Sequence, residues 1–423
     1  MHITMVAIGS LGDVQPYIAL GLGLKRAGYQ VRIAAFGVFD QLVRKHGLEF
    51  AAIEGDPRQT MQQQMGQAWL ESGRNPVAFM RGLQRLINQA AEKSLVDTFE
   101  ACRGTDAIVY SMLGAGGYHV AEKLGVPSLF ALLQPFSRTR EFPSIAMPAL
   151  PLGGGYNRLT HLASEQLIWQ MGRVTINRWR REVLKLSPVP FGGLFRSLCA
   201  KREPFIYGFS QFVVPRPHDW PDWHHITGYW FLDGAFDWSP PAGLVDFITS
   251  GPKPIYVGFG SMSGRTAQQL AGLSIEAVTL AKQRAVLLGG WAQVHQRNPP
   301  DHIYAIESAP HEWLFPRMAA VVHHGGAGTT AAGLRAGVPS VITPFFADQP
   351  YWGRRVHALG VGPKPISRKA LTAQRLAEAI TQAVTDQAML RRAAALGEKI
   401  RAEDGVGTAV AIITQYLSGK GVQ

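Results

Sequence analysis

Short apolar runs alternate with helix-like stretches along most of the chain, and this alternation predicts the fold. The runs are ITMVAIGS, VRIAAF, LEFAAI, AIVYSM and PSLFALL in the first half, and PIYVGFGSM, RAVLLGG, HIYAIES, AAVVHHGG and PSVITPF in the second. Continuous apolar runs separated by helices are typical of parallel strands covered on both faces. We predict an α/β fold of two Rossmann-like, doubly wound domains that face each other across a cleft, with ligands bound outside the carboxyl ends of the strands.

The middle of the chain follows a different pattern. One long helical stretch, RLTHLASEQLIWQMGRVTINRWRREVLKL, mixes aliphatic residues with arginines, which fits a packed helix with a basic outer face, a membrane-interface helix or a wall of an apolar pocket. The segment DWPDWHHITGYWFLDGAFDWSPPAG, rich in Pro, Trp, Asp and Gly, indicates a domain boundary. We predict a first domain over 1–218, a linker region over 219–250, a second domain over 251–400, and a helix over 401–423 that packs back on the first domain.

Composition narrows the class of protein. The 423 residues are 46% apolar and 17% charged, as in globular proteins. A net charge of +12 favours phosphorylated ligands, polyanions or an anionic membrane as partners, although a basic surface also serves solubility. The two cysteines, Cys102 and Cys199, have no metal-ligand or disulfide-framework spacing. No signal-peptide pattern or apolar run of ~18–20 residues is present. We expect a cytoplasmic protein, with peripheral contact to the inner membrane face left open.

The stretch VVHHGGAGTT carries the clearest chemical pattern. A strand ends near its histidines, Gly325, Gly326 and Gly328 allow close backbone approach, and a helix begins at Thr329. The start of a helix behind a glycine turn binds anions, because its N–H groups are unpaired and its dipole favours negative charge. With His324 as an added donor or cation, the pattern indicates a diphosphate site. The alternative is a turn that only connects a strand to a helix. The usual dinucleotide and P-loop fingerprints are absent, which disfavours a dehydrogenase or an ATPase.

Three further turns follow predicted strands. In FFADQP, Asp348 and Gln349 offer a carboxylate beside an amide, which suits vicinal sugar hydroxyls, or else a plain turn. In GSLGDVQP, Asp13 is either a helix N-cap or a base directed into a cleft. In YVGFGSM, Ser261 offers a hydroxyl to a phosphate oxygen.

These residues resemble the inverting, nucleotide-sugar-dependent glycosyltransferases of the two-Rossmann-domain (GT-B) type. The block APHEWLFPRMAAVVHHGGAGTTAAGLRAGVPSVITPFFADQPYWGRRV looks most like sterol 3β-glucosyltransferases. The segments GSLGDVQPYIALGLGLKRAGYQVRIAAF, GLEFAAIEGDP and PFSRTREFPS also resemble that family, so the likeness covers nearly the whole chain.

The resemblance implies that 1–218 is an acceptor-binding domain and 251–400 a nucleotide-sugar-binding domain, and it implies a role for each matching position. Asp13 would be the general base. His324 and its glycine turn would hold the donor diphosphate, and Asp348 and Gln349 would hold the sugar. The donor-binding residues implied in full are Ser10, Gly12, Ser261, Trp291, His311, His324, Gly326, Ala327, Gly328, Thr329, Asp348 and Gln349. The acceptor is expected to contact Phe130, Phe136, Phe142, Met147 and Trp169.

The resemblance also implies the reaction. A hexose, glucose from UDP-glucose, would move to a hydroxyl of an apolar acceptor such as a sterol, giving a β-glycoside. No metal and no cofactor beyond the nucleotide-sugar co-substrate are expected, and nucleic acid is not an expected partner.

Two departures from the family leave alternatives open. Plant relatives carry a ribose-binding Glu at the position of Ala332, and the sterol family usually has a basic residue at that of Leu11. The second interpretation is a glycosyltransferase that uses a UDP- or dTDP-sugar and acts on an antibiotic, polyketide, flavonoid or glycolipid acceptor. A nucleotide-sugar 2-epimerase and a basic binding protein without enzymatic activity are the remaining ones.

Overall fold

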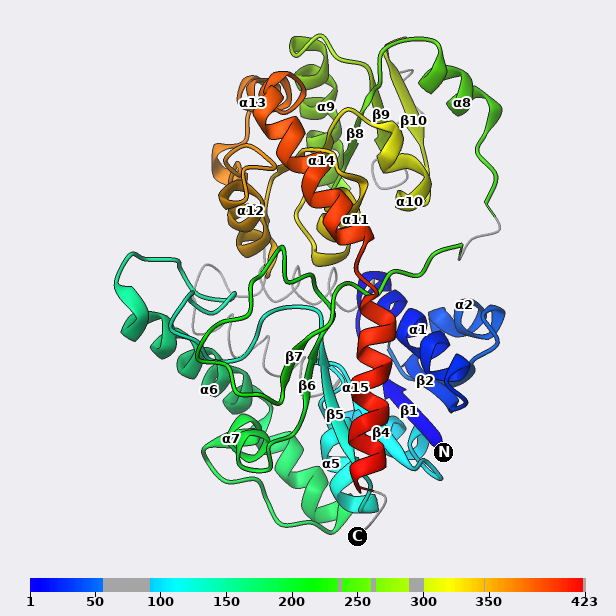
Figure 1. The fold of residues 1–423 in the computed structure, drawn as a ribbon, viewed down its shortest axis with the longest axis vertical. Coiled ribbons are helices and arrows are strands. Elements are labelled where there is room, and N and C mark those ends of the chain that lie inside the picture. The colour runs from blue at the N-terminus through cyan, green and yellow to red at the C-terminus, as the bar shows by residue number, and fades with distance from the viewer. Residues whose placement is uncertain (56–91, 235–237, 260–263, 289–299, 346, 421–423) are drawn as a thin grey trace. The chain divides into compact units, whose positions relative to one another are not determined.

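The computed structural model describes residues 1–55, 92–234, 238–259, 264–288, 300–345 and 347–420 (Figure 1). The chain forms two compact units. Unit 1 comprises Met1–Gln211, Arg216–Leu232 and Asp404–Gln423, and unit 2 comprises Phe212–Pro215 and Asp233–Glu403.

Unit 1 is built on a parallel sheet of seven strands. Their order is β3 (Glu49–Ile53), β2 (Gln30–Phe36), β1 (His2–Val6), β4 (Ala107–Tyr110), β5 (Ser128–Leu132), β6 (Phe205–Tyr207) and β7 (His224–Ile226). Its helices include α1 (Leu11–Arg26), η1 (Gly37–Phe39), α2 (Asp40–Lys45), α5 (Gly116–Leu124), α6 (Gly153–Trp179), the π-helical η2 (Arg180–Leu184), α7 (Gly193–Ala200) and α15 (Gly405–Lys420), and residues 92–101 are helical as well. The five apolar runs of the first half all form strands. The sequence did not reveal β6 and β7, because each has three residues and β7 carries two histidines.

Unit 2 has a smaller parallel sheet. The strand order is β10 (Ile303–Ile306), β9 (Ala285–Leu288), β8 (Ile255–Gly258), β11 (Val321–His323) and β12 (Ser340–Ile342), which match the five apolar runs of the second half. Its helices are α8 (Ala242–Thr249), α9 (Gly264–Leu280), α10 (His311–Leu314), η4 (Phe315–Arg317), α11 (Ala327–Ala336), α12 (Gln349–Ala358), η5 (Arg368–Ala370), α13 (Ala373–Thr385) and α14 (Gln387–Arg401).

The last described helix completes the core of the first unit. Ala409, Ile413 and Leu417 of α15 are buried in the same cluster as Val14 and Ile18 of α1. Gly23 permits this contact, because a Cβ there would collide with the side chain of Val406. The segment 219–250, which the sequence pattern assigned to a linker, is divided: β7 lies in the sheet of unit 1, and α8 lies in unit 2.

Each sheet reverses its strand order at one place. In unit 1 the reversal lies between β1 and β4, and in unit 2 it lies between β8 and β11. At such a switch point the connections leave in opposite directions and open a crevice at the carboxyl ends of the strands. The turns after β1 and β11 therefore border the two crevices.

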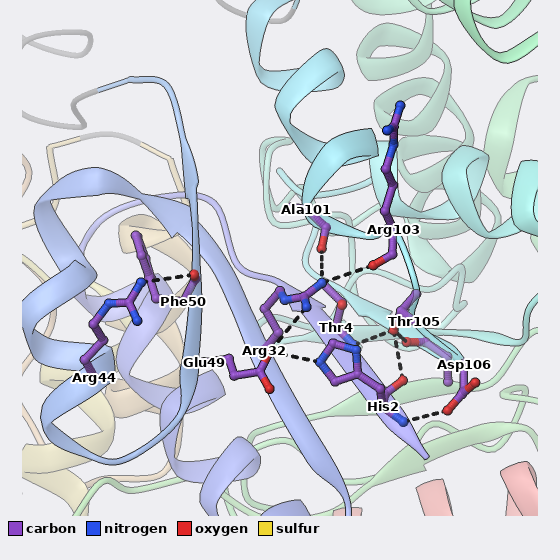
Figure 2. Close-up of polar contacts among 11 residues, drawn as sticks. His2, Thr4, Arg32, Arg44, Glu49, Phe50, Ala101, Arg103, Thr105 and Asp106 are labelled. Atoms are coloured by element: carbon purple, nitrogen blue, oxygen red, sulfur yellow. Dashed lines mark hydrogen bonds and ion pairs between the residues drawn. The ribbon is translucent and has the colours of Figure 1, made fainter.

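At the amino ends of the unit 1 strands, side chains hydrogen-bond to the backbone and to one another (Figure 2). The backbone N–H of His2 donates to Asp106 at 2.7 Å, and that of Thr4 donates to the Thr105 hydroxyl at 3.0 Å. Arg32 donates to the carbonyls of Ala101 and Arg103 and pairs with Glu49. A groove of about 430 Å³ nearby is lined by Arg32, Ala51, Ala52, Asp97, Glu100, Ala101 and Arg103. Arg32 is already engaged and Arg103 pairs with Glu100, so we place the candidate site at the other end of the strands.

Candidate active site

Asp13 lies in the first turn of α1, directly after the turn that leaves β1. Its Oδ2 atom accepts the backbone N–H of Ser10 at 2.8 Å and the Ser10 hydroxyl at 2.8 Å. Gly9 has φ +144°, and a Cβ there would lie 2.5 Å from the same oxygen, so only glycine fits beside the carboxylate. Ser10, and not Asp13, is therefore the N-cap of α1, and Asp13 completes a capping box through one oxygen. Its Oδ1 atom makes no hydrogen bond recorded within the described parts of the chain.

The surroundings of Asp13 tune its carboxylate. Burial raises its pKa from the ordinary value of 3.8, and this outweighs the two bonds from Ser10, which act in the opposite direction. One turn further on, the buried hydroxyl of Tyr17 donates to the carbonyl of Ala131 at 2.7 Å. A raised pKa makes a carboxylate a better proton acceptor for an alcohol.

The second candidate group follows β11 in unit 2. Gly326 is the N-cap of α11, and a Cβ on it would lie 2.7 Å from His324 Nε2, so the imidazole lies against the start of the helix. Gly325 has φ +90° and faces Ile342 too closely for a side chain. Its N–H donates to His323 Nδ1 at 3.0 Å, which places the proton of the neutral His323 ring on Nε2. The Nδ1 atom of His324 is buried and has no partner among the described residues.

The partial positive charge at this site comes from the start of the helix and not from a protonated histidine. Burial lowers the pKa of His324 to about 4, so the ring is neutral at pH 7. The pKa of His311 is also lowered to about 4, by burial and then by His324. The first N–H groups of a helix lack intrahelical partners and carry a partial positive charge. The start of α11 with His324 is therefore a set of neutral donors suited to a diphosphate.

Asp348 and Gln349 lie on the same edge of the unit 2 sheet, after β12. Asp348 is the N-cap of α12, and its Oδ2 accepts the indole N–H of Trp352 at 2.8 Å. The side-chain oxygen of Gln349 accepts the backbone N–H of Phe345 at 2.8 Å. A Cβ on Gly325 would lie 3.2 Å from the Gln349 carbonyl, so the turns after β11 and β12 touch. The structure therefore brings these residues together with His324.

The other residues expected to bind the nucleotide-sugar lie in different parts of the structure. Gly12 is exposed beside Ser10 in unit 1. Ala327, Gly328 and Thr329 form the first turn of α11. His311 stacks on Phe315 with ring centroids 4.2 Å apart. Ser261 and Trp291 lie outside the described residues.

The five aromatic or aliphatic residues expected at the acceptor differ in exposure. Phe130 is fully buried and stacks on Tyr110 at 4.9 Å, and Phe136 stacks on Phe195 at 5.0 Å. Trp169 is buried against Gly193. These three pack in the core, where an acceptor would reach them only if neighbouring side chains moved. Phe142 and Met147 are half-buried on the loop after β5.

Sequence analysis missed the contacts that hold this loop. Arg138 and the buried Glu165 form a bidentate ion pair, with an Arg138 Nη2–Glu165 Oε2 distance of 2.6 Å. The backbone N–H of Ser144 donates to the Thr160 hydroxyl at 2.9 Å, and the Thr139 hydroxyl donates to Asp219 at 2.7 Å. The two residues in each of these contacts are far apart in the sequence, so no local motif predicts them.

Comparison with known proteins agrees with this geometry. The glycosyltransferase family 28 N-terminal domain matches residues 3–143, and the C-terminal domain of proteins like erythromycin biosynthesis protein CIII matches residues 281–413. A solved calicheamicin glycosyltransferase is 17% identical with a TM-score of 0.72, covering 99% of this chain and 98% of that one. The kitacinnamycin glycosyltransferase is 21% identical with a TM-score of 0.71, covering 98% of this chain and 99% of that one. These likenesses show that the chain has the fold of the GT-B glycosyltransferases.

Within that class the sequence is similar to sterol 3-beta-glucosyltransferases. The protein of Glomerella lagenarium is 40% identical over 427 residues, which is 98% of this chain and 28% of the relative. That of Emericella nidulans is 40% identical over 431 residues, which is 99% of this chain and 30% of the relative. The chain thus spans less than a third of the length of these relatives.

Proposed function

We propose that the protein is an inverting glycosyltransferase that moves glucose from UDP-glucose to a hydroxyl of an apolar, sterol-like acceptor. The observation that carries the proposal is the placement of Asp13 and of the His324–α11 turn at the switch points of two parallel sheets. The similarity to sterol 3-beta-glucosyltransferases supports the acceptor class.

The donor diphosphate would bind at the start of α11. The N–H groups of Ala327, Gly328 and Thr329 and the neutral ring of His324 would donate to its oxygens. These donors stabilise the charge that grows on the leaving group as the glycosidic bond breaks. His311 would line the nucleoside base, and Asp348 and Gln349 would hold the sugar hydroxyls, with Ser10, Gly12, Ser261 and Trp291 completing the donor site.

Asp13 would take the proton of the acceptor hydroxyl. Its Oδ1 is the atom available for this, because Oδ2 is held by Ser10. A carboxylate is a weak base for an alcohol even with a raised pKa, so proton transfer accompanies attack of the oxygen on the anomeric carbon. A single displacement inverts that carbon and converts an α-linked donor into a β-glycoside.

The acceptor would bind in unit 1, beside the loop that carries Phe142 and Met147. An acceptor of this kind is found in membranes, and the protein would reach it from the cytoplasm as a peripheral protein of an anionic membrane face. Among the described residues, no helix combines the length and apolar character needed to span a bilayer.

A dTDP-sugar is the competing donor. Ala332 provides no carboxylate for a ribose 2′-hydroxyl, and the solved Streptomyces glycosyltransferase complexed with thymidine diphosphate has this fold. That structure is 21% identical to this chain, with a TM-score of 0.65. Deoxyribose lacks the 2′-hydroxyl, so the two donors can be separated by measurement.

The test is product analysis by mass spectrometry. UDP-glucose and dTDP-glucose are each incubated with a sterol or a flavonoid, with and without a chelator. We expect a hexosyl-sterol from UDP-glucose, unaffected by the chelator. Asp13→Asn should abolish it, whereas Asp40→Asn, which changes an acid in the first turn of another helix of unit 1, should not. Binding of UDP with no glycosylated sterol would exclude the acceptor assignment.

A further inference from the structure

The long helix α6 buries several polar residues and exposes several large apolar ones. Thr160, His161, Ser164 and Glu165 are buried, together with Trp169, Thr175 and Trp179. On the other side, Leu159 is 62% exposed, Leu167 is 49% exposed and Val174 is 59% exposed. A helix at the surface of a soluble protein normally has the reverse arrangement.

The polar inner face has a structural cause. It packs on the loop after β5, whose backbone and Arg138 need polar partners. His161 Nε2 lies 3.0 Å from the carbonyl of Phe142, Thr160 accepts from the N–H of Ser144, and Glu165 pairs with Arg138. These bonds hold the inner face in place, and α6 cannot rotate to bury its leucines without breaking them.

The exposed apolar residues form a continuous stripe. Leu159, Leu167 and Val174 are eight and seven residues apart, close to two helical turns in each case, so they lie on one face. Ala163, which is also exposed, lies between the first two. We call these four residues the α6 stripe.

Basic residues outnumber acidic ones in the segment that contains the α6 stripe. Between positions 150 and 196 the chain has seven lysines and arginines and two glutamates, Glu165 and Glu182. Glu165 is buried and paired, while Arg158, Arg181, Lys185 and Arg196 are exposed. An exposed apolar stripe on a segment with excess positive charge matches the headgroup and acyl boundary of an anionic bilayer.

We propose that the α6 stripe docks the protein on an anionic lipid membrane, with α6 lying in the plane of the interface. This rests on the proposed function, because it says where the enzyme meets a lipid acceptor. The loop after β5, which carries Phe142 and Met147, leads directly into α6. Docking through the stripe therefore brings the expected acceptor loop to the membrane surface.

The test compares two leucines of equal exposure. Leu167 of the stripe and Leu280 at the end of α9 in unit 2 are both 49% exposed. The protein is mixed with vesicles of pure phosphatidylcholine, or of phosphatidylcholine with phosphatidylserine, and bound protein is measured by flotation. We expect binding to the phosphatidylserine vesicles that weakens with salt. Leu167→Gln should reduce it about tenfold, and Leu280→Gln should leave it unchanged. The triple variant Leu159→Gln/Leu167→Gln/Val174→Gln should not bind, and circular dichroism checks that it is folded.

A second readout separates this inference from the proposed reaction. Turnover is measured with sterol dissolved in cyclodextrin and with sterol held in phosphatidylserine-containing vesicles. We expect the triple variant to retain turnover with dissolved sterol and to lose it with vesicles. Vesicle binding that the triple substitution leaves intact would overturn the docking surface while the reaction stands. Stripe-dependent vesicle binding without turnover of either sterol would overturn the reaction while the surface stands. A wild-type dimer that does not bind vesicles and that the triple variant disperses would assign the stripe to a second copy, and this would also overturn the proposal.

Discussion

The two oxygens of Asp13 differ in their contacts. Oδ2 accepts two hydrogen bonds from Ser10 at the start of α1, and Oδ1 is the oxygen that the proposed base would use. The cap fixes the carboxylate, and its partial burial raises its pKa. Sequence analysis treated a capping role and a role as general base as alternatives for Asp13. In the structure the capping contact occupies one carboxylate oxygen and leaves the other for the proposed role as base.

Asp13→Asn is expected to separate stability from turnover. Burial raises the pKa of Asp13 in the folded protein above its value in the unfolded chain, so its charge costs stability at neutral pH. The amide removes that charge, and the melting temperature should stay or rise. Turnover should fall by on the order of 10²–10⁴. Calorimetry and initial rates measure the two effects, and a variant that unfolds would contradict the expectation.

The same pKa predicts the acid limb of the wild-type rate profile. The base must be deprotonated, so kcat/KM should fall as the pH drops through the raised pKa of Asp13, above the ordinary value of 3.8. Rates are measured across the acid range, with the folded state monitored by circular dichroism. A profile that stays flat until the protein unfolds would exclude Asp13 as the titrating base.

Gly326→Ala is expected to act on His324 and not on the backbone. Gly326 has φ −61° and ψ 147°, which alanine adopts readily, but the new Cβ would lie 2.7 Å from His324 Nε2. The ring must move away from the start of α11. UDP affinity, measured by titration calorimetry, should fall about tenfold or more, with thermal stability nearly unchanged. Gly37→Ala, where a Cβ meets open space, is the control.

At the scale of elements, the loop after β5 and α6 stabilise each other. The ion pair between Arg138 of the loop and the buried Glu165 of α6 joins them. A second contact joins the backbone carbonyl of Phe142 in the loop to the His161 ring of α6. The predicted strands followed from unbroken apolar runs. The orientation of α6 could not be predicted, because its apolar and polar residues give two faces without saying which is buried.

Arg138→Met tests the coupling of loop and helix. It leaves a buried carboxylate without its partner, and such a loss typically costs about 3–5 kcal/mol. We expect a lower melting temperature and weaker turnover. Because the cost comes from the unpaired charge, Arg138→Met/Glu165→Leu should recover most of the stability. No recovery in the double variant would show that the loss had another cause.

At the scale of the molecule, the chain builds one unit from both of its ends. Alternating apolar runs were enough to predict two α/β units. They could not place the boundary within 219–250, because a three-residue strand such as β7 has too few positions to show a period. The C-terminal helix was expected to pack on the first domain, but no local pattern shows that α1 is the helix that α15 contacts.

Ile413→Ala is expected to weaken unit 1 and leave unit 2 unchanged. Ile413 is fully buried in the core shared by α1 and α15. Removing its side chain should cost about 2–5 kcal/mol and lower one of two unfolding transitions by about 4–20 °C. Scanning calorimetry resolves the transitions, and Gln415→Ala, at an exposed position of α15, is the control. An equal shift of both transitions would mean that the units unfold together.

Both units should lose stability in mild acid. Burial lowers the pKa of His119 and His224 to about 3 in unit 1, and that of His311 and His324 to about 4 in unit 2. The unfolded chain takes up protons near pH 6.5 that the folded chain refuses, so stability falls as the pH drops from there toward 4. For His119 and His224 the loss is about 1.4 kcal/mol per pH unit each.

His224→Phe isolates one contribution to this slope. Both ring nitrogens of His224 lack a partner in the described part of the chain, and the ring stacks on Phe205 at 4.5 Å. Phenylalanine keeps the stacking and removes the proton site, so urea unfolding of unit 1 should depend less steeply on pH. His218→Phe, at an exposed position, should leave the slope unchanged.

The position of α15 sets an order of events during synthesis. Translation must pass Leu417 before the core around α1 can close, although α1 is synthesised before α8 to α14 of unit 2. Unit 2, whose last residue is Glu403, can be completed earlier. Of the two units, the one that contains α1 is therefore finished last. Until then its open apolar face is exposed to chaperones and proteases, so a nascent chain that stalls short of α15 carries a completed unit 2 and an incomplete unit 1.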